Sequence, residues 1–188
     1  MNARERDVAK IVAAASDLFA EHGPARVSLR DIARAAGVNY GLIHQYIGSK
    51  DDLLKLVFRS SSSRWSTSFA EAEGVEAAVD YLMRPKSTVY VRMLAHTLLE
   101  GRDPGKLLEA SSALQELSRR LREEAGADDD LDARIQAAAM TCTAMGWGLF
   151  GPFIRVIAGL EDEPEPELTE RVYSYVRNAV LGQQHPDQ

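Results

Sequence analysis

The sequence predicts an all-α protein in which a small N-terminal domain of three helices precedes a larger helical domain. Two observations support this fold class. Apolar residues recur at three- and four-residue spacing in almost every segment, and the strand-like alternation of β-branched residues is absent. Glycines, prolines and capping residues divide these segments into helices. A chain of 188 residues is long enough for one large domain, or two small ones, with a real core.

The first two helices are delimited by their apolar spacing and by short capping patterns. Residues 8–19 keep helical apolar spacing, and Gly23 ends that helix. Ser28, followed three residues later by Asp31, forms a capping-box pattern that opens a short second helix. Gly37 is placed to end the second helix, because glycine adopts the left-handed conformation at no steric cost.

Asn39 is predicted to cap a third helix over residues 40–47, and Gly48 ends it. Ser49 and Asp52 repeat the capping-box pattern and open a fourth helix. The later helices are expected near residues 50–67, 74–84, 86–100, 104–125, 131–158 and 167–182.

We therefore predict two domains, with residues 1–48 in the first and residues 49–188 in the second. The helix at 49–67 connects the two. No repeat of a fixed period is visible in the chain.

Charge is distributed unevenly between the two ends of the chain. The net charge is −6, yet residues 1–50 carry seven basic and five acidic side chains, while residues 51–188 carry 15 basic and 23 acidic ones. Only the N-terminal quarter is therefore suited to approach a polyanion. Arg4 and Arg6 are expected to form a mobile basic arm that touches a nucleic-acid backbone or minor groove.

Two short helices joined by a turn that contains Gly37 have the spacing of a helix-turn-helix motif, whose second helix enters a DNA major groove. Ile43 and Ile47 would face inward. Tyr40 and His44 would face outward and can donate hydrogen bonds to phosphate oxygens. The predicted outward side chains of the third helix are Tyr40, Leu42, His44 and Gln45.

The remaining side chains suggest individual roles at a DNA surface. The Gln45 amide suits an adenine edge, Leu42 suits a thymine methyl group, and Gly41 allows close approach of the backbone. Lys50 and Arg30 lie in the first turns of helices, where the helix dipole favours an anion. Ser28 serves equally well as a helix cap alone. The candidate DNA contacts are Ser28, Arg30, Asn39, Tyr40, Gly41, Leu42, His44, Gln45, Tyr46 and Lys50.

Residues 7–58 carry a longer pattern. It comprises Ile11-Val12-Ala13-Ala14-Ala15, Phe19, Gly23, Val27-Ser28-Leu29-Arg30-Asp31-Ile32-Ala33, Ala36-Gly37-Val38, Gly41 and Ser49-Lys50-Asp51-Asp52-Leu53-Leu54. In this pattern the chain resembles the tetracycline-repressor (TetR) family of bacterial transcription regulators. The resemblance implies an N-terminal helix-turn-helix DNA-binding domain followed by a larger helical ligand-binding and dimerisation domain. It also implies a homodimer formed through the last two helices, a small-molecule inducer, and a recognition helix at residues 39–46.

The chain departs from the family pattern at several positions of the third helix. The family usually has Ser or Thr at Asn39, Thr at Leu42, Tyr at His44, Phe at Ile47 and often Pro at Gly48. Asn39 can still cap the helix and Ile47 can still pack inward. Leu42 loses a hydroxyl contact, while His44 can still form a hydrogen bond with a phosphate.

The C-terminal part carries apolar side chains with a few hydroxyl groups and one histidine, a combination typical of a ligand cavity and equally of an ordinary core. The candidate ligand contacts are Tyr90, Met93, His96, Met140, Thr143, Trp147 and Phe150. A face of small residues on the long helix and an apolar stripe on the last helix predict a four-helix dimer interface. Its candidate residues are Ala139, Cys142, Gly146, Leu149, Leu168, Val172, Tyr175, Val176 and Ala179.

The sequence favours a sequence-specific transcriptional regulator, most simply a repressor that binds a palindromic operator as a homodimer and is released by an inducer. The alternative is a helical module that binds a small molecule or a protein and does not act through DNA. An enzyme is not expected, because Cys142 lacks basic neighbours and no phosphate loop or nucleophile elbow is present.

No metal site or cofactor is expected either. The acidic runs at 128–130 and 161–163 lack the alternating ligands and central glycine of a calcium loop. The charged start of the chain does not resemble a secretory signal, and no apolar run approaches the roughly 20 residues of a membrane span, so we expect a cytoplasmic protein.

Overall fold

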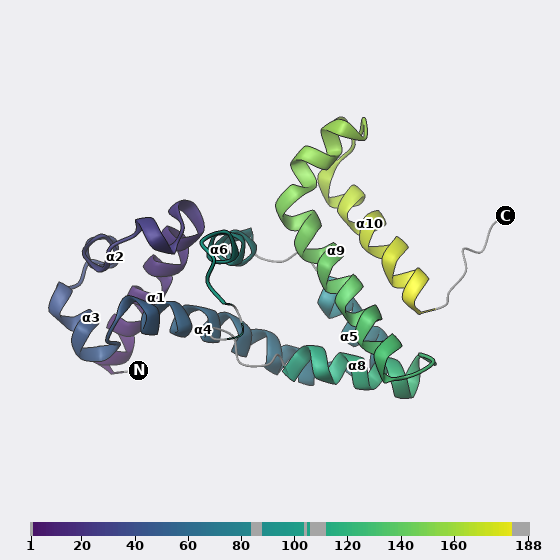
Figure 1. Cartoon of the computed structure of the whole chain (residues 1–188), viewed down its shortest axis with the longest axis horizontal. Coiled ribbons are helices and arrows are strands. Elements are labelled where there is room, and N and C mark those ends of the chain that lie inside the picture. The colour runs from purple at the N-terminus through teal and green to yellow at the C-terminus, as the bar shows by residue number, and fades with distance from the viewer. Residues whose placement is uncertain (1, 84–87, 104, 106–111, 182–188) are drawn as a thin grey trace. The chain divides into compact units, whose positions relative to one another are not determined.

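The computed structural model describes residues 2–83, 88–103, 105 and 112–181 (Figure 1). All regular secondary structure within these residues is helical, as predicted. The chain divides into two compact units. One comprises residues 1–64 and 88–110, and the other comprises residues 65–87 and 111–188.

The first unit begins with α1 (Ala3–His22), the 3-10 helix η1 (Pro24–Arg26), α2 (Leu29–Ala36), α3 (Tyr40–Tyr46) and the start of α4 (Lys50–Ala70). Capping interactions set these boundaries. α2 begins with the predicted capping box of Ser28 and Asp31, and ends at Gly37, whose φ of 64° is left-handed. Ser49 and Asp52 exchange the same pair of hydrogen bonds ahead of α4.

The expected mobile arm at the N-terminus is wrong. α1 already begins at Ala3, because Asn2 and Glu5 form a capping box that the sequence reading did not identify. Arg4 is therefore part of a helix, and its guanidinium lies over the ring of Tyr46, 5.3 Å from the centroid. This residue is held against α3 by helix geometry and a cation–π contact.

The core of the first unit is formed by fully buried apolar side chains from α1, α2, α3 and α4, together with one helix that follows much later in the chain. That helix is α6 (Thr88–Leu99), and its Met93 is fully buried in the same cluster as Ile11, Phe19 and Phe58. The predicted first domain, residues 1–48, lies within this unit. The unit also includes α6 and the first part of α4, because apolar side chains of these two helices pack against the core of α1, α2 and α3.

The second unit contains α5 (Gly74–Met83), α8 (Ser112–Glu124), α9 (Asp130–Ile157) and α10 (Glu165–Val180). Its core gathers the apolar faces of these helices. The fully buried members are Ala78, Val79, Leu117, Leu121, Met140 and Ala144. The helix positions agree with the predicted ones to within a few residues where the structure describes them. Parts of four predicted helices lie outside the described residues, namely residues 84, 86–87, 104, 106–111 and 182.

α9 is the longest described helix, and it continues through Pro152 to Ile157. By length and composition alone it is the one described helix that could cross a membrane, but a core helix of a soluble protein passes the same test. Several large apolar side chains on its surface are exposed within the monomer. They are Leu131, Ile135, Phe150, Phe153, Val156 and Ile157.

Candidate nucleic-acid interface

α3 is held from behind by one fully buried side chain. Ile43 belongs to the core of the first unit, and the half-buried Ile47 and Val38 pack against the same cluster, as predicted. The helix has only seven residues, so this packing, not its intrinsic propensity, holds it in place. Its other face is left toward solvent.

The outward face of α3 carries a small polar cluster built on Tyr40. The Tyr40 side chain is 40% exposed, and its hydroxyl lies 2.7 Å from Nε2 of His44. The two rings meet edge to face, with centroids 4.9 Å apart. The Arg30 guanidinium, from α2, lies 5.7 Å from the centre of the Tyr40 ring. The two helices therefore present a cation, a hydroxyl group and an imidazole on one surface.

Gln45 and Gly41 are exposed, whereas Leu42 and Tyr46 are half-buried. A Cβ added at Gly41 would lie 3.3 Å from Oδ1 of Asn39, so even a methyl group there would crowd the cap of the helix. None of the seven residues of α3 is acidic. A surface of this kind can accept phosphate oxygens and base edges without charge repulsion.

Two of the predicted contacts have their side-chain oxygens engaged in capping. Asn39 Oδ1 accepts a hydrogen bond from the Gly41 N–H at 2.8 Å. The Ser28 hydroxyl donates to Asp31 Oδ2 at 2.5 Å and accepts from the Asp31 N–H at 3.2 Å. The Ser28 hydroxyl proton is thus already used, so its main role is to begin α2.

Lys50 has a structural role that the sequence did not reveal. Its half-buried side chain reaches back to the turn before α2, where Nζ donates to the carbonyls of Pro24 at 2.9 Å and Val27 at 3.2 Å. An ammonium group has three N–H donors, so one remains for a phosphate oxygen. Lys50 therefore ties α4 to the turn that precedes the helix-turn-helix motif, and one of its N–H donors is not used by these two carbonyls.

The seven predicted ligand contacts divide between the two units. Met93 is fully buried in the first core, Tyr90 meets Phe58 edge to face, and His96 lies against Gly23. In the second unit, Met140 is fully buried, Thr143 donates to the Ala139 carbonyl, Trp147 donates to Thr169 Oγ1 at 2.9 Å, and Phe150 is 55% exposed. Core packing thus accounts for Met93 and Met140, and the ligand assignment stays a prediction.

The predicted dimer residues separate into two classes. Leu168 is buried within its own unit, and Val172 and Val176 pack against that unit's core. Tyr175 is 67% exposed on α10. The other predicted members are exposed or half-buried: Ala139, Cys142, Gly146, Leu149 and Ala179. Large apolar residues missed by the prediction extend this face of α9 in both directions, from Leu131 to Ile157.

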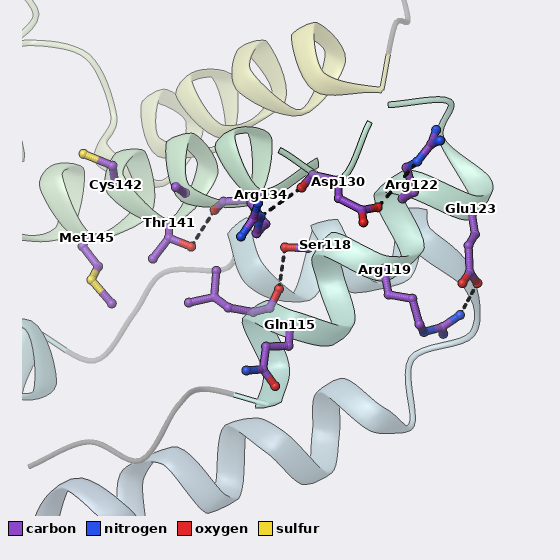
Figure 2. A pocket seen from close by; sticks show the side chains of 13 residues that line it. Gln115, Ser118, Arg119, Arg122, Glu123, Asp130, Arg134, Thr141, Cys142 and Met145 are labelled. Carbon is purple, nitrogen blue, oxygen red and sulfur yellow. Dashed lines mark hydrogen bonds and ion pairs between the residues drawn. The ribbon is translucent and has the colours of Figure 1, made fainter. Parts of the chain in front are cut away.

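A groove of about 900 Å³ lies between α8 and α9 in the second unit (Figure 2). None of the predicted ligand contacts lines it, although Cys142 from the predicted dimer face does. The groove was not foreseen because its residues come from two helices whose pairing is not visible in the sequence. Its lining residues are Leu114, Gln115, Ser118, Arg119, Arg122, Glu123, Asp130, Arg134, Ala137, Ala138, Thr141, Cys142 and Met145.

Comparison with known proteins supports the DNA-binding interpretation. Residues 11–57 match the family described as bacterial regulatory proteins, tetR family. The chain is 36% identical over 168 residues to the HTH-type transcriptional repressor Rv3405c of Mycobacterium tuberculosis, covering 88% of this chain and 84% of that protein. Another relative, the HTH-type transcriptional regulator HbdR of an Aromatoleum species, is 45% identical over 51 residues, which are 27% of this chain and 22% of that one.

Solved structures share the fold across nearly the whole chain. GusR of Salmonella enterica has a TM-score of 0.69 at 20% identity, and the match covers 97% of each chain. The fatty acid degradation regulator FadR of Bacillus halodurans has a TM-score of 0.68 at 23% identity, covering 95% of this chain and 96% of that one. With its helix-turn-helix geometry and its similarity to a regulator over most of its length, the chain belongs to the tetR family of bacterial regulatory proteins.

Proposed function

We propose that this transcriptional regulator is a cytoplasmic repressor that binds a palindromic operator as a homodimer and is released by a small-molecule inducer. The observation that supports DNA reading best is the outward face of α3. Ile43 anchors this helix in the core, while Tyr40, His44 and Gln45 face outward with no carboxylate among them. The relative from Mycobacterium tuberculosis is named a transcriptional repressor, which supports repression over activation.

A dimer is supported by the apolar surface of α9 and α10. Phe153, Val156 and Ile157 on α9 and Tyr175 on α10 are each more than 60% exposed in the monomer. Contiguous exposed apolar residues of this size mark an association surface. A homodimer with twofold symmetry would offer two copies of α3, which predicts half-sites about 34–36 Å apart along the DNA.

Release by an inducer is a shift between two populations of the dimer. The inducer would bind more tightly to a form whose two α3 helices no longer match successive major grooves. The largest decrease in operator affinity that such a ligand can cause equals the ratio of the ligand's affinities for the two forms of the dimer.

The test is selection of DNA from a random pool by the purified, ligand-free full-length protein. We expect enrichment of one imperfect palindrome. The Gln45→Ala variant should then relax the preference at one base position in each half-site, because a bidentate amide contact distinguishes bases by roughly 1–3 kcal/mol. The matched control is Gln115→Ala, which removes an exposed amide on α8 and should leave the preference unchanged.

Lys50→Ala should weaken binding to all DNA sequences alike, because the proposed contact of Lys50 is with a phosphate and not with a base. The variant also loses the hydrogen bonds from Lys50 to the Pro24 and Val27 carbonyls, which hold α4 to the turn before α2. Binding to the selected palindrome should also fall steeply as salt concentration rises. Failure to enrich any sequence would overturn the proposal and favour a module that binds a small molecule or a protein.

A further inference from the structure

The groove between α8 and α9 has a charged end and an apolar end (Figure 2). Asp130 and Met145 lie fifteen residues apart on α9, which corresponds to about 22 Å along the helix. Near Asp130 the lining is ionic, with Arg122 and Glu123 from α8 and Arg134 from α9. Near Met145 it consists of methyl, thiol and thioether groups from Ala138, Cys142 and Met145 together with Leu114.

Two of the three arginines in the groove are already paired. Arg119 donates two hydrogen bonds to Glu116, at 2.9 and 2.7 Å, and also contacts Glu123. Arg122 donates to the Ala127 carbonyl at 2.7 Å and lies 3.7 Å from Asp130. These two cations are therefore paired with carboxylates that line the groove or lie next to it.

Arg134 differs from both. Its Nε donates to the Asp130 carbonyl at 3.1 Å, and among the described residues no carboxylate lies within ion-pair distance of its guanidinium. The two terminal NH₂ groups of this side chain, which form a planar fork suited to a carboxylate, remain available in the groove. Arg134 is thus the groove arginine whose terminal NH₂ groups are not engaged by any carboxylate of the described residues.

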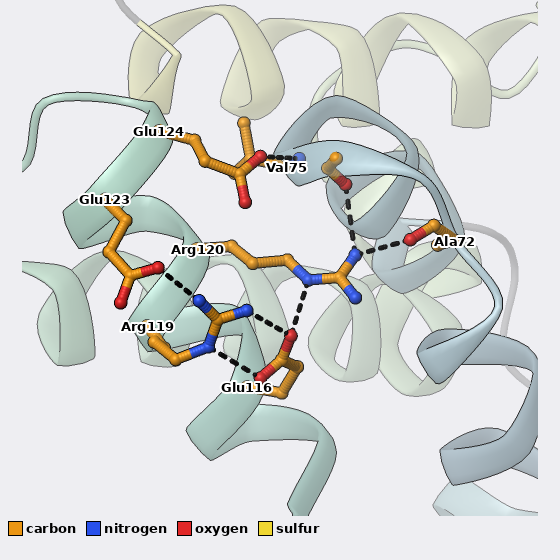
Figure 3. A network of polar contacts seen from close by, with 8 residues as sticks. Ala72, Val75, Glu116, Arg119, Arg120, Glu123 and Glu124 are labelled. Atoms are coloured by element: carbon orange, nitrogen blue, oxygen red, sulfur yellow. Dashed lines mark hydrogen bonds and ion pairs between the residues drawn. The ribbon is translucent and has the colours of Figure 1, made fainter.

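Arg119 is also fixed in place by a polar network (Figure 3). Glu116 accepts a further hydrogen bond from Arg120 at 2.8 Å, and the largely buried Arg120 donates to the carbonyls of Ala72 and Gly74. Hydrogen bonds from Arg119 and Arg120 lower the pKa of Glu116 to about 2. Glu116 stays ionised at neutral pH, so Arg119 remains committed to it and is a poor anchor for a ligand.

The hydroxyl groups in the groove add no donors of their own. Ser118 donates to the Leu114 carbonyl at 2.9 Å, and Thr141 donates to the Ala137 carbonyl at 2.8 Å. Both hydroxyl protons are therefore used within their helices. Apart from the arginine guanidinium groups, the strong side-chain donor that the groove offers to a ligand is the Gln115 amide.

We propose that the α8–α9 groove binds an amphiphilic organic monoanion, with its carboxylate on Arg134 and its apolar body directed toward Met145. A volume of about 900 Å³ lies within the range of small-molecule sites. A dianion is disfavoured because Glu123 and Asp130 line the same end. The binding site itself is independent of the proposed function. Only the further step, that such an anion is the inducer, rests on the proposed function.

The test is isothermal titration calorimetry of the full-length protein with sodium 4-phenylbutyrate, sodium hexanoate and the neutral 4-phenylbutyramide. We expect at least one carboxylate to bind, and phenylbutyrate to bind roughly tenfold or more tightly than its amide, because a charge-assisted pair replaces a neutral one. Arg134→Gln should abolish this preference, and Arg134→Lys should restore part of it. Arg171→Gln, which removes an exposed arginine on α10 outside the groove, is the matched control and should behave like the wild type.

A second variant tests the apolar end. Ala138 is exposed on α9, so Ala138→Trp should fold normally while filling the groove and weakening both phenylbutyrate and its amide. Circular dichroism and thermal unfolding without ligand verify the fold of each variant. Equal affinity of the wild type and Arg134→Gln for the carboxylates, or no carboxylate binding in the millimolar range, would overturn the proposed site.

Operator binding, measured separately, distinguishes this proposal from the proposed function. If the ligand-free protein selects a palindrome but binds no carboxylate, the regulator stands and the site fails. If phenylbutyrate binds through Arg134 but no DNA is selected, the site stands and the repressor fails. Where both hold, phenylbutyrate should weaken operator binding by the wild type more than by Arg134→Gln.

Discussion

At the scale of single residues, two serine–aspartate pairs begin the helices on either side of α3. Ser28 and Asp31 begin α2, and Ser49 and Asp52 begin α4. In each pair the serine hydroxyl and its backbone N–H donate to the aspartate, and these hydrogen bonds lower the pKa of the Asp31 and Asp52 carboxyl groups. The helix-turn-helix motif is thus bounded by interactions that need ionised carboxylates.

Ser28→Ala should raise the pKa of Asp31 toward its ordinary value, about 3.9 in an unfolded chain. The substitution removes the hydrogen bond from the Ser28 hydroxyl, which is the largest cause of the lowered pKa. The pKa of Asp31 is lower in the folded protein than in the unfolded chain, so the Ser28–Asp31 pair stabilises the fold at pH values above the unfolded pKa. This contribution is lost as the pH falls through the pKa of Asp31 in the folded protein. Titration of the Asp31 carboxyl carbon by NMR measures the shift, with Asp52 in the same sample as the internal control. An unchanged Asp31 midpoint in Ser28→Ala would contradict this account.

At the scale of elements, the turn between α1 and α2 is fixed by the end of α6. Gly23 ends α1 with a φ of 80°, and a Cβ there would lie 2.7 Å from Oε1 of Glu100 and 3.1 Å from Nδ1 of His96. The same Glu100 oxygen accepts a hydrogen bond from the Ala25 N–H at 2.8 Å. The absence of a side chain at Gly23 therefore lets α6 hold the start of the helix-turn-helix motif.

Gly23→Ala should destabilise the protein by about 1–3 kcal/mol, because it imposes a conformation that is nearly restricted to glycine and displaces Glu100 from Ala25. Gly37→Ala is the matched control. Gly37 also has a positive φ, of 64°, but nothing lies within 4 Å of a Cβ there, so its cost should be smaller, about 1 kcal/mol. Urea unfolding of both variants measures the difference. A Gly37→Ala variant that is the less stable of the two would show that the α6 contact is unimportant.

At the scale of the whole molecule, each unit buries its own core and the second retains an uncovered apolar surface. The exposed large apolar residues of α9 form two groups, Leu131 and Ile135 near its start and Phe150, Phe153, Val156 and Ile157 near its end. At 3.6 residues per turn, both groups lie along one broad side of the helix. The proposed homodimer would cover this side, and two recognition helices are needed to read a palindrome.

Phe153→Glu should convert the proposed dimer into a monomer. Phe153 is 63% exposed in the monomer, and the proposed dimer would bury it, so the variant would place a charge inside the interface. Sedimentation velocity at micromolar concentration measures the change, and affinity for the selected palindrome should fall with it. Leu99→Glu, at an apolar residue of α6 that is 86% exposed, is the control and should remain a dimer. A wild-type protein that sediments as a monomer would remove the dimer from the proposal.

Much of the local structure could be predicted from the sequence because it depends on short-range chemistry. The capping box at Ser28, the left-handed turn at Gly37, the Asn39 cap and the inward direction of Ile43 all involve residues a few positions apart. The Asn2 cap follows the same rules but was not predicted, because Arg4 and Arg6 were expected to form a mobile arm and not the first turn of a helix.

Contacts between distant segments could not be predicted in this way. Nothing near Lys50 in the sequence indicates that its ammonium reaches Pro24 and Val27, and nothing near Met93 indicates that it packs with Ile11 and Phe19. Each apolar residue in the later helices was compatible with a core, a cavity or an interface until its neighbours were known.

The sequence by itself determined the all-α class, most helix boundaries of the helix-turn-helix motif and the composition of the recognition helix, because these follow from periodicity, capping and side-chain chemistry along one segment. Only the tertiary structure decided that α6 completes the core around the helix-turn-helix motif, that Arg134 alone among the groove arginines lacks an acidic partner within the described residues, and which side of α9 stays uncovered. The physical reason is that burial and charge pairing depend on which segments meet in space, and helical periodicity specifies an apolar face without specifying its partner.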